Sequence, residues 1–220
     1  CGAAVTGLRP VAEIRFADFT SPAFNQIVSE AARMRYRSNN GYGVPMTIRA
    51  PYGGGVHGAL YHSQSVEAFF THVPGLKVVV PSTPYDARGL LRSSIRDEDP
   101  VLFFEHKKMY RSVRGDVPDT DYTVPLGKAK ITHPGSQVTV VAYGLMATYA
   151  PGAADPGADD GIGAEVGGRR TRRRPTRATV STTARTARTR AWTSPIPTPA
   201  TRSSRREKRA PHPRRAPQDD

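Results

Sequence analysis

One histidine stands out in the stretch GALYHSQSVEAFFTHVPGL, residues 58–76. His62 comes after the glycine-rich segment PYGGGVHG and just before a run with helical spacing of apolar residues. An imidazole changes protonation state near neutral pH, so it suits proton transfer or the stabilisation of charge during a reaction. The alternative is a polar residue that only opens a helix, and the residues around it leave both interpretations open.

The elements on either side of this stretch predict an α/β fold for residues 5–150. In the first expected helix, apolar residues recur at three- and four-residue spacing, with Ser21 as the N-cap. The alternation of strands and helices predicts a parallel sheet with helices on both faces, and His62 then lies near the carboxyl ends of the strands, where clefts form. The expected strands are 11–19, 45–51, 76–82, 100–106 and 137–144, and the expected helices are 21–38, 63–73 and 83–97.

The charge is spread unevenly along the chain, whose net charge is +13. Residues 1–150 hold 16 basic and 12 acidic residues, whereas residues 151–220 hold 16 basic and 7 acidic ones. Residues 151–220 are rich in Arg, Thr, Pro and Ala and contain few large apolar side chains, so we expect them to be disordered. The alternatives are an arginine-rich arm that binds nucleic acid, a tail with no evolved role, and a change of reading frame near residue 150.

The remaining composition excludes several classes of protein. A single cysteine, Cys1, rules out an internal disulfide and a cysteine cluster that binds a metal. The first residues show no signal-peptide pattern, and no apolar run reaches the length of about 20 residues that a membrane span needs. We therefore expect a soluble, intracellular protein that has no targeting segment in this chain.

Three segments in this order resemble a known family: GLRPVAEIRFADFTSPAFNQIVSEAARMRYRS, then APYGGGVHGALYHSQSVEAFFTHVPGLKVVVPSTPYDARGLLRSSIRDEDPVLFFEHKKMYR, then VPLGKAKI. They are similar to the beta subunit of the thiamine-diphosphate-dependent 2-oxo acid dehydrogenase decarboxylases. HGALYHSQSVEAFF and FFEHKKMYR look most similar to the branched-chain type, with the pyruvate type next. The resemblance covers about residues 2–146 and leaves out the basic tail.

The resemblance implies a domain arrangement and a set of partners. Residues 1–122 would form a transketolase-like pyrimidine-binding domain, residues 123–150 would start a second α/β domain, and residues 151–220 would be the disordered or frame-shifted tail. It implies thiamine diphosphate shared with an alpha subunit, Mg²⁺ held by that subunit, and K⁺ in branched-chain members. It also implies an alpha2beta2 heterotetramer that passes an acyl group to a lipoyl acyltransferase core, with no membrane and no specific nucleic acid as partner. The compartment would be the bacterial cytoplasm or the mitochondrial matrix.

The same resemblance assigns roles to individual residues. His62 matches the beta-subunit histidine that acts as the cofactor's intermediate meets the lipoyl group. Phe19 matches the aromatic residue that packs against the aminopyrimidine ring. The potassium ligands, mostly backbone carbonyls, correspond to Val44, Met46, Thr47, Ser94, Asp97 and Asp99.

The family's beta subunit also supplies a glutamate from a segment upstream of GLRP, and the second domain is only begun before the resemblance ends. We therefore expect the 220-residue chain by itself to lack decarboxylase activity. Neither the choice between branched-chain and pyruvate substrates nor the origin of the tail follows from the sequence. A transketolase-like enzyme and a non-enzymatic basic binding protein remain as alternatives.

Overall fold

The computed structural model describes residues 1–159, 163–168 and 170–172. Most of the predicted basic tail, from residue 173 onward, lies outside the described residues, as do its proposed roles. Among the described helices none combines the length and the apolar character that crossing a bilayer requires.

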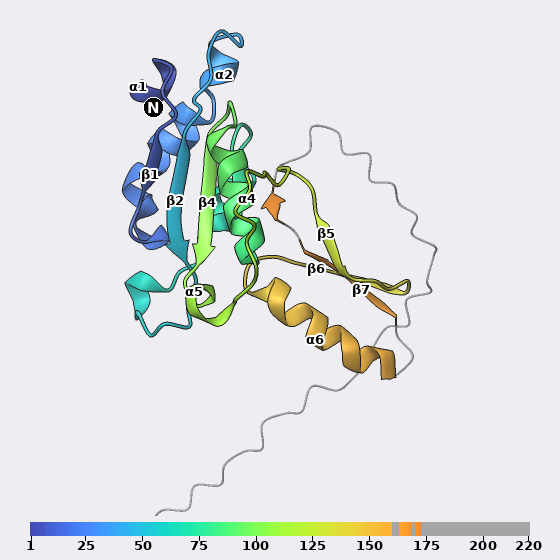
Figure 1. The fold of residues 1–220 in the computed structure, drawn as a ribbon. Coiled ribbons are helices and arrows are strands. Elements are labelled where there is room, and N and C mark those ends of the chain that lie inside the picture. The colour runs from blue at the N-terminus through green and yellow to red at the C-terminus, as the bar shows by residue number, and fades with distance from the viewer. Residues whose placement is uncertain (160–162, 169, 173–220) are drawn as a thin grey trace, which may run out of the picture. The chain divides into compact units, whose positions relative to one another are not determined.

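The first sheet has five strands in the order β1-β2-β4-β3-β8 (Figure 1). Strands β1, β2, β4 and β3 run parallel, and β8 adds to β3 in the antiparallel direction. The central pair, β2 and β4, is in register from Thr47 opposite Val101 to Tyr52 opposite His106. The bounds are β1 (Val11–Glu13), β2 (Thr47–Tyr52), β3 (Lys77–Val79), β4 (Val101–His106) and β8 (Thr171–Arg172).

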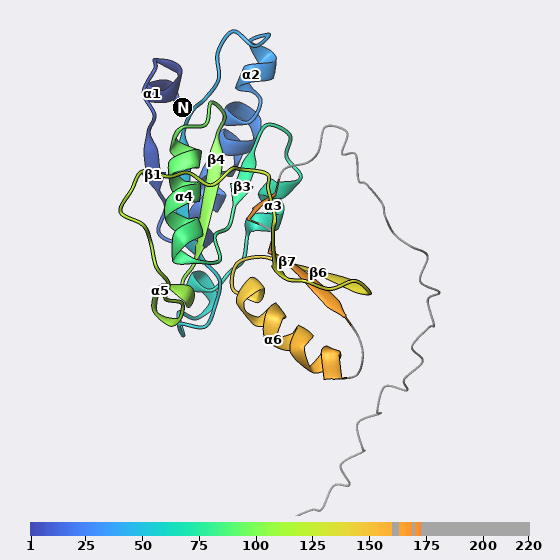
Figure 2. The ribbon, with the colours of Figure 1, turned by 45° about the vertical axis from the view of Figure 1, so that its right-hand side comes forward.

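Helical segments connect these strands and cover both faces of the sheet, as Figure 2 shows for α3 and α4. This confirms the predicted fold class. The segments are α1 (Gly2–Val5), η1 (Ala17–Ala23), η2 (Gln26–Ala31), α2 (Met34–Arg37), η3 (Leu60–His62), α3 (Glu67–Thr71), α4 (Pro84–Ile95) and α5 (Met109–Ser112). Thr83 begins α4 by accepting a hydrogen bond from the Asp86 amide at 3.1 Å, and Pro84 occupies the first turn.

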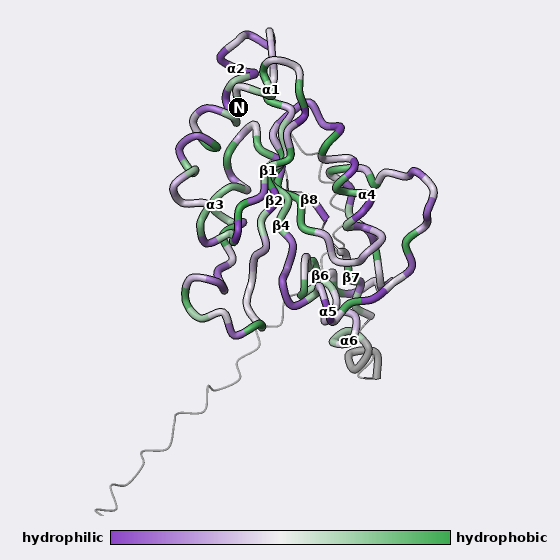
Figure 3. Tube along the Cα trace, turned by 60° about the vertical axis from the view of Figure 1, so that its left-hand side comes forward, coloured by the Kyte–Doolittle hydropathy of each residue, from purple (hydrophilic) through white to green (hydrophobic). Residues whose placement is uncertain are grey.

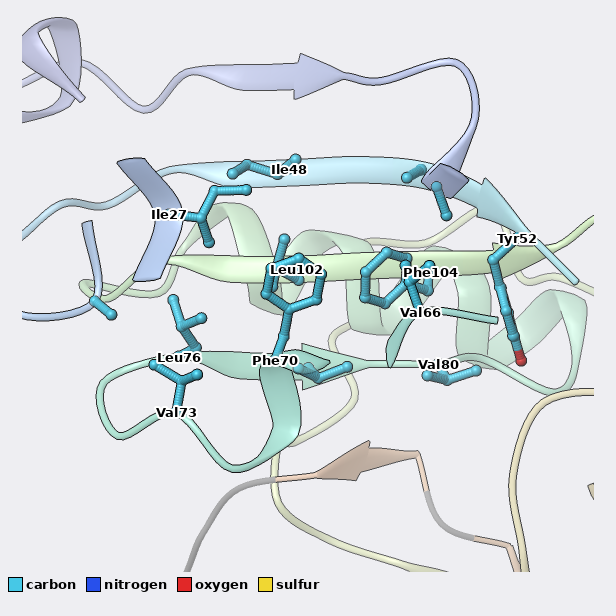
Figure 4. Packing of buried hydrophobic residues seen from close by; sticks show 14 residues of the cluster. Ile27, Ile48, Tyr52, Val66, Phe70, Val73, Leu76, Val80, Leu102 and Phe104 are labelled. Carbon is cyan, nitrogen blue, oxygen red and sulfur yellow. The ribbon is translucent and has the colours of Figure 1, made fainter. Parts of the chain in front are cut away.

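Alternate residues of β4 point into two different hydrophobic clusters, as the two-residue period of a strand requires. Leu102 and Phe104 face the cluster that includes Phe70 of α3, whose ring centroid lies 6.0 Å from that of Phe104 (Figure 4). Val101 and Phe103 face the opposite cluster, which includes Leu90 of α4. Figure 3 shows hydrophobic and hydrophilic residues following one another along α4, as expected of a helix with one buried face. A sheet buried on both faces therefore forms the core.

The helix expected at 21–38 differs in detail from the prediction. The helical backbone begins earlier, at Ala17, and it runs as a 3-10 segment, a π segment and a short α-helix. Ser21 lies inside η1 rather than at a helix start, because the chain turns directly after the three-residue β1. The predicted buried face is still present, since Ile27 and Ala31 are 3% and 2% exposed.

A second, three-stranded sheet has the order β5-β7-β6, with β6 and β7 parallel. Its elements are β5 (Lys130–His133), β6 (Val138–Ala142), α6 (Met146–Asp159) and β7 (Ala164–Gly168). Regular structure thus continues beyond residue 150, where the sequence analysis started the tail. The predicted boundary at residue 150 falls inside α6. Strand β7 pairs with a strand on each side, and this pairing holds it in the sheet although it has few large apolar side chains.

Candidate functional site

The loop that carries His62 leaves the carboxyl end of β2 and folds back against the end of β4. The Gly53 amide donates a hydrogen bond to the Gln64 carbonyl at 2.9 Å, which closes the loop at its base. Gly53 has a φ of +80°, and a Cβ atom there would lie 2.4 Å from Nε2 of His106. Only glycine allows this conformation and this close approach without strain. The carboxyl ends of the two central strands therefore present the loop, as predicted.

The His62 ring contacts two phenylalanine rings from the segment that follows β1. Its centroid is 4.8 Å from that of Phe16 and 5.8 Å from that of Phe19, both in edge-to-face geometry. Phe19 is 44% exposed, so part of its ring is open to a ligand. Aromatic pairs in this geometry attract each other weakly and fix the orientation of the imidazole. His62 and Phe19, which the resemblance assigns to one cofactor site, are thus neighbours.

A carboxylate holds the backbone directly after His62. Oδ1 of Asp18 accepts hydrogen bonds from the amides of Ser63 at 3.3 Å and Gln64 at 3.1 Å. The other oxygen, Oδ2, is buried and has no hydrogen-bond partner within the described part of the chain. Asp18 did not emerge from the sequence analysis, although its position between two aromatic residues in RFADF was a usable signal.

Two residues at the end of β4 complete the surroundings of the site. Nζ of Lys107 lies 4.8 Å from the centroid of Phe16, and the residue is only 7% exposed. Burial lowers the pKa of Lys107, and the nearby charge of Asp18 opposes that effect. Burial, together with the charges of Lys107 and Lys108, lowers the pKa of His106. These effects favour a neutral imidazole at His106.

An open cavity of about 880 Å³ lies beside Phe16 and Lys107. Its described lining contains four basic residues and one acidic residue, Glu13. The basic lining residues are Arg15, Lys107, Lys108 and Arg111. The His62 end of the sheet thus combines an imidazole, exposed aromatic surface and a positively charged cavity. Such a set suits an aromatic ligand and proton transfer.

The six residues predicted as potassium ligands lie at the opposite, amino-terminal edge of the sheet. Val44, Met46 and Thr47 lead into β2, and the turn after α4 leads into β4. Thr47 pairs with Val101 in register, and the Met46 carbonyl accepts a hydrogen bond from the Val101 amide at 2.9 Å. A Cβ atom on Gly43 would lie 2.6 Å from the Glu98 carbonyl oxygen. The structure therefore brings the two predicted ligand segments together.

The carboxylates of that turn already have cationic partners. Nζ of Lys77 lies 2.6 and 2.7 Å from the two oxygens of Asp97 and 3.3 Å from Oδ2 of Asp99. Nε of Arg35 donates to Oδ1 of Asp99 at 2.5 Å. Burial opposes ionisation of Asp99, but the hydrogen bond from Arg35 and the charge of Lys77 outweigh it and lower the pKa.

Other atoms near this turn are candidates for a cation of low charge. The Thr47 hydroxyl oxygen is buried and has no hydrogen-bond partner in the described residues, as a ligand atom without its ion would be. Ser94 donates its hydroxyl to the Leu90 carbonyl at 2.7 Å. Residues 1–159, 163–168 and 170–172 contain no group of three or more His, Cys, Asp or Glu side chains that could hold a metal. The donor set fits a monovalent ion bound by hydroxyl and carbonyl oxygens better than Mg²⁺.

Comparisons with known proteins identify two family models along the chain. "Transketolase, pyrimidine binding domain" matches residues 1–113, which is about half of the chain. "Transketolase, C-terminal domain" matches residues 127–191. A solved structure described as "Split gene transketolase, inactive beta4 tetramer" is similar with a TM-score of 0.59 and 27% sequence identity, and the similarity covers 76% of this chain and 51% of that one.

Curated relatives carry more specific names. The chain is 61% identical over 170 residues to "2-oxoisovalerate dehydrogenase subunit beta" of Bacillus subtilis, covering 77% of this chain and 52% of the relative. It is 52% identical over 166 residues to "2-oxoisovalerate dehydrogenase subunit beta 2, mitochondrial" of Arabidopsis thaliana, covering 75% and 46%. It is 48% identical over 170 residues to "Pyruvate dehydrogenase E1 component subunit beta" of Bacillus subtilis, covering 77% and 52%. The chain spans about half the length of these curated relatives.

Proposed function

Because the chain belongs to the transketolase pyrimidine-binding domain family, we propose that it is part of the beta subunit of a thiamine-diphosphate-dependent 2-oxo acid dehydrogenase of the branched-chain type. One observation carries the proposal. Over 170 residues in each case, identity is 61% to a 2-oxoisovalerate dehydrogenase beta subunit and 48% to a pyruvate dehydrogenase beta subunit of the same organism. The pyruvate type is the alternative.

The residues of η1, which follows β1, fit the aminopyrimidine half of the cofactor. The exposed part of the Phe19 ring offers an apolar face for packing. Thiamine diphosphate, when bound, supplies the carbon nucleophile and takes up the electrons that decarboxylation releases. His62, whose ring contacts Phe16 and Phe19, would supply the proton that the released lipoyl sulfur needs when the acyl group is transferred to the other sulfur of the disulfide.

The proposal includes two metal ions, Mg²⁺ and K⁺, held by different subunits. Mg²⁺ would be held by the alpha subunit. K⁺ would be held by the Thr47 hydroxyl and by backbone carbonyls of Val44, Met46 and the turn from Ser94 to Asp99. These segments lie at the amino-terminal ends of β2 and β4. The buried, unpartnered Thr47 oxygen supports this assignment. Lys77 and Arg35 already pair with Asp97 and Asp99, so these carboxylates offer little net negative charge to a divalent ion.

The proposed assembly is an alpha2beta2 heterotetramer that serves a lipoyl acyltransferase core. The relatives' names identify them as beta subunits, which implies an alpha partner. The compartment would follow the source organism, since named relatives come from a bacterium and from mitochondria: the cytoplasm in the first case and the matrix in the second.

Two chimeras test the assignment. In one, residues 1–146 replace the matching stretch of the B. subtilis 2-oxoisovalerate dehydrogenase beta subunit; in the other, they replace that of the pyruvate dehydrogenase beta subunit. Each is co-expressed with its own alpha subunit and assayed for carbon dioxide release with thiamine diphosphate, Mg²⁺ and the matching 2-oxo acid.

We expect the first chimera to stay within about tenfold of its parent in kcat/KM and the second to lose more than that, because packing around the site differs between the types. Equal activity of both chimeras, or a better second one, would reject the branched-chain assignment. Inactivity of both, with active parents, would reject the enzyme assignment.

A further inference from the structure

We infer that Asp18 is a positioning residue: its carboxylate clamps the backbone directly after His62 and thereby fixes where the imidazole points. The inference rests on the proposed function for its catalytic consequence, whereas the clamp itself stands on the geometry. Asp18 reaches the site from η1, a segment distant in sequence from the loop that carries His62.

The clamp acts on the two amides nearest to His62 on its carboxyl side. One oxygen, Oδ1, accepts from the amides of both Ser63 and Gln64. The Gln64 carbonyl also accepts a hydrogen bond from the Gly53 amide at 2.9 Å. The Asp18 carboxylate is therefore connected to Ser63 and Gln64 directly and to Gly53 through Gln64. Hydrogen bonds from backbone amides to a charged carboxylate are stronger than those to a neutral acceptor. The η3 turn that carries His62 also includes a long backbone hydrogen bond, 3.5 Å from the His62 amide to the Ala59 carbonyl.

The same short segment also supplies the rings that flank the imidazole. Phe16 and Phe19 lie two residues before and one residue after Asp18, and both contact the His62 ring edge to face. One segment thus contacts the histidine at its ring and at its following backbone. The two phenylalanine rings alone would leave the backbone after His62 free to shift, and the Asp18 carboxylate alone would leave the His62 ring free to rotate. The rings and the carboxylate together restrict both the backbone and the ring.

Lys107 is a charged neighbour of this segment, and its Nζ atom lies 4.8 Å from the Phe16 ring centroid. Burial lowers the pKa of Lys107, and the charge of Asp18 opposes that effect. Ser63 and Gln64 approach from the loop, Phe16 from η1's amino end, and Lys107 from the end of β4. A carboxylate oxygen has two lone-pair sites, so Oδ1 of Asp18 can accept from two amides at once.

The position of the His62 ring is directly measurable in the chain by NMR. Two flanking aromatic rings displace the Hδ2 and Hε1 resonances of His62 from those of a free histidine, and the H62Q variant assigns them. We expect Asp18→Ala to move both resonances toward free-histidine values. Asp18→Asn keeps one acceptor oxygen, so its resonances should lie closer to wild type than those of Asp18→Ala. Asp116→Ala, which removes an exposed aspartate, is the matched control and should change neither.

A second measurement keeps the inference testable if Asp18→Ala does not fold. In the wild-type chain, the amides of Ser63 and Gln64 should exchange with solvent at least about tenfold more slowly than unprotected amides of the same sequence. Unprotected exchange at both amides, or unchanged His62 resonances in a folded Asp18→Ala, overturns the clamp. Neither readout uses thiamine or an alpha subunit, so a failure here is distinct from a failure of the proposed function.

Discussion

Replacing Lys77 by methionine removes the cation at the centre of the turn that precedes β4. Its Nζ atom donates to both oxygens of Asp97 at 2.6 and 2.7 Å and to Asp99 at 3.3 Å. Methionine keeps most of the volume and the apolar stem of the side chain and loses only the charge and the donors. The change therefore isolates the electrostatic part of the interaction.

The expected loss of stability follows from the burial of Lys77 and of its carboxylate partners Asp97 and Asp99. Those of Lys77 and Asp97 are only 15% and 16% exposed, so removing the cation leaves Asp97 charged and poorly solvated. Losing one partner of a fully buried pair costs about 3–5 kcal/mol, and an exposed pair contributes about 1 kcal/mol or less. Arg35 still pairs with Asp99, and some water reaches the site, so we expect a loss of about 2–3 kcal/mol.

Urea unfolding followed by circular dichroism measures this loss. With a slope of about 2 kcal/mol per molar urea, the midpoint at pH 7 should fall by about 1–1.5 M. The matched control is Lys128→Met, the same substitution at an exposed lysine, which should leave the midpoint unchanged within about 0.2 M.

The pH dependence gives an independent check of the mechanism. The folded-state pKa of Asp99 is lowered from the ordinary value of 3.8, so the ion pair stabilises fully above that value and is lost as the pH falls through the lowered pKa. The part of the difference between wild type and Lys77→Met that comes from Asp99 should therefore be present at pH 7 and should shrink as the pH falls below 3.8. Equal midpoints for wild type and Lys77→Met at pH 7 would refute the reasoning.

Three further substitutions test the packing that supports the site. Both oxygens of Asp86 lie 3.0 Å from guanidinium nitrogens of Arg170, so Asp86→Ala leaves this guanidinium buried without its partner. The free energy of unfolding should fall by about 3–5 kcal/mol. A loss below about 1 kcal/mol in a urea titration would show that the pair is not formed. Gly75→Ala should destabilise by more than about 1 kcal/mol in thermal unfolding, because φ is +92° and the new Cβ would lie 1.9 Å from the Ala32 carbonyl oxygen; unchanged melting would contradict the turn geometry. Phe70→Ala, at a position with no solvent exposure, should cost about 3–5 kcal/mol, and a cost near that of a surface change would contradict the core assignment.

Strands β2, β3 and β4 of the first sheet were predictable because their short apolar runs are typical of buried parallel strands, whereas β1 is shorter than the expected strand at 11–19 and β8 was not expected. LKVVVPS contains β3 and PVLFFEH contains β4, as the sequence indicated. Helix α4 was equally clear, since Thr83 and Pro84 mark its start. In such segments local preference and tertiary packing agree, so the local pattern is sufficient.

The parts that sequence reasoning missed depend on contacts between distant segments. Nothing near Asp18 in the sequence reveals that it meets the amides of Ser63 and Gln64, 45 and 46 residues away. Similarly, the pairing of Lys77 with Asp97 spans 20 residues and joins the amino end of β3 to the turn after α4. The continuation of regular structure past residue 150 was missed because β7 has small residues and depends on its neighbouring strands.

The central claim is that His62 acts on the acyl group once it has formed on the cofactor, and one comparison tests it directly. In the 2-oxoisovalerate chimera, His62→Gln is compared with His72→Gln, a change at an exposed histidine at the end of α3. The assay follows acyl transfer to a lipoyl domain beside carbon dioxide release. We predict that His62→Gln lowers the rate of acyl transfer by about 100-fold or more, while His72→Gln leaves it unchanged. Equal rates of acyl transfer in the two variants would contradict the account.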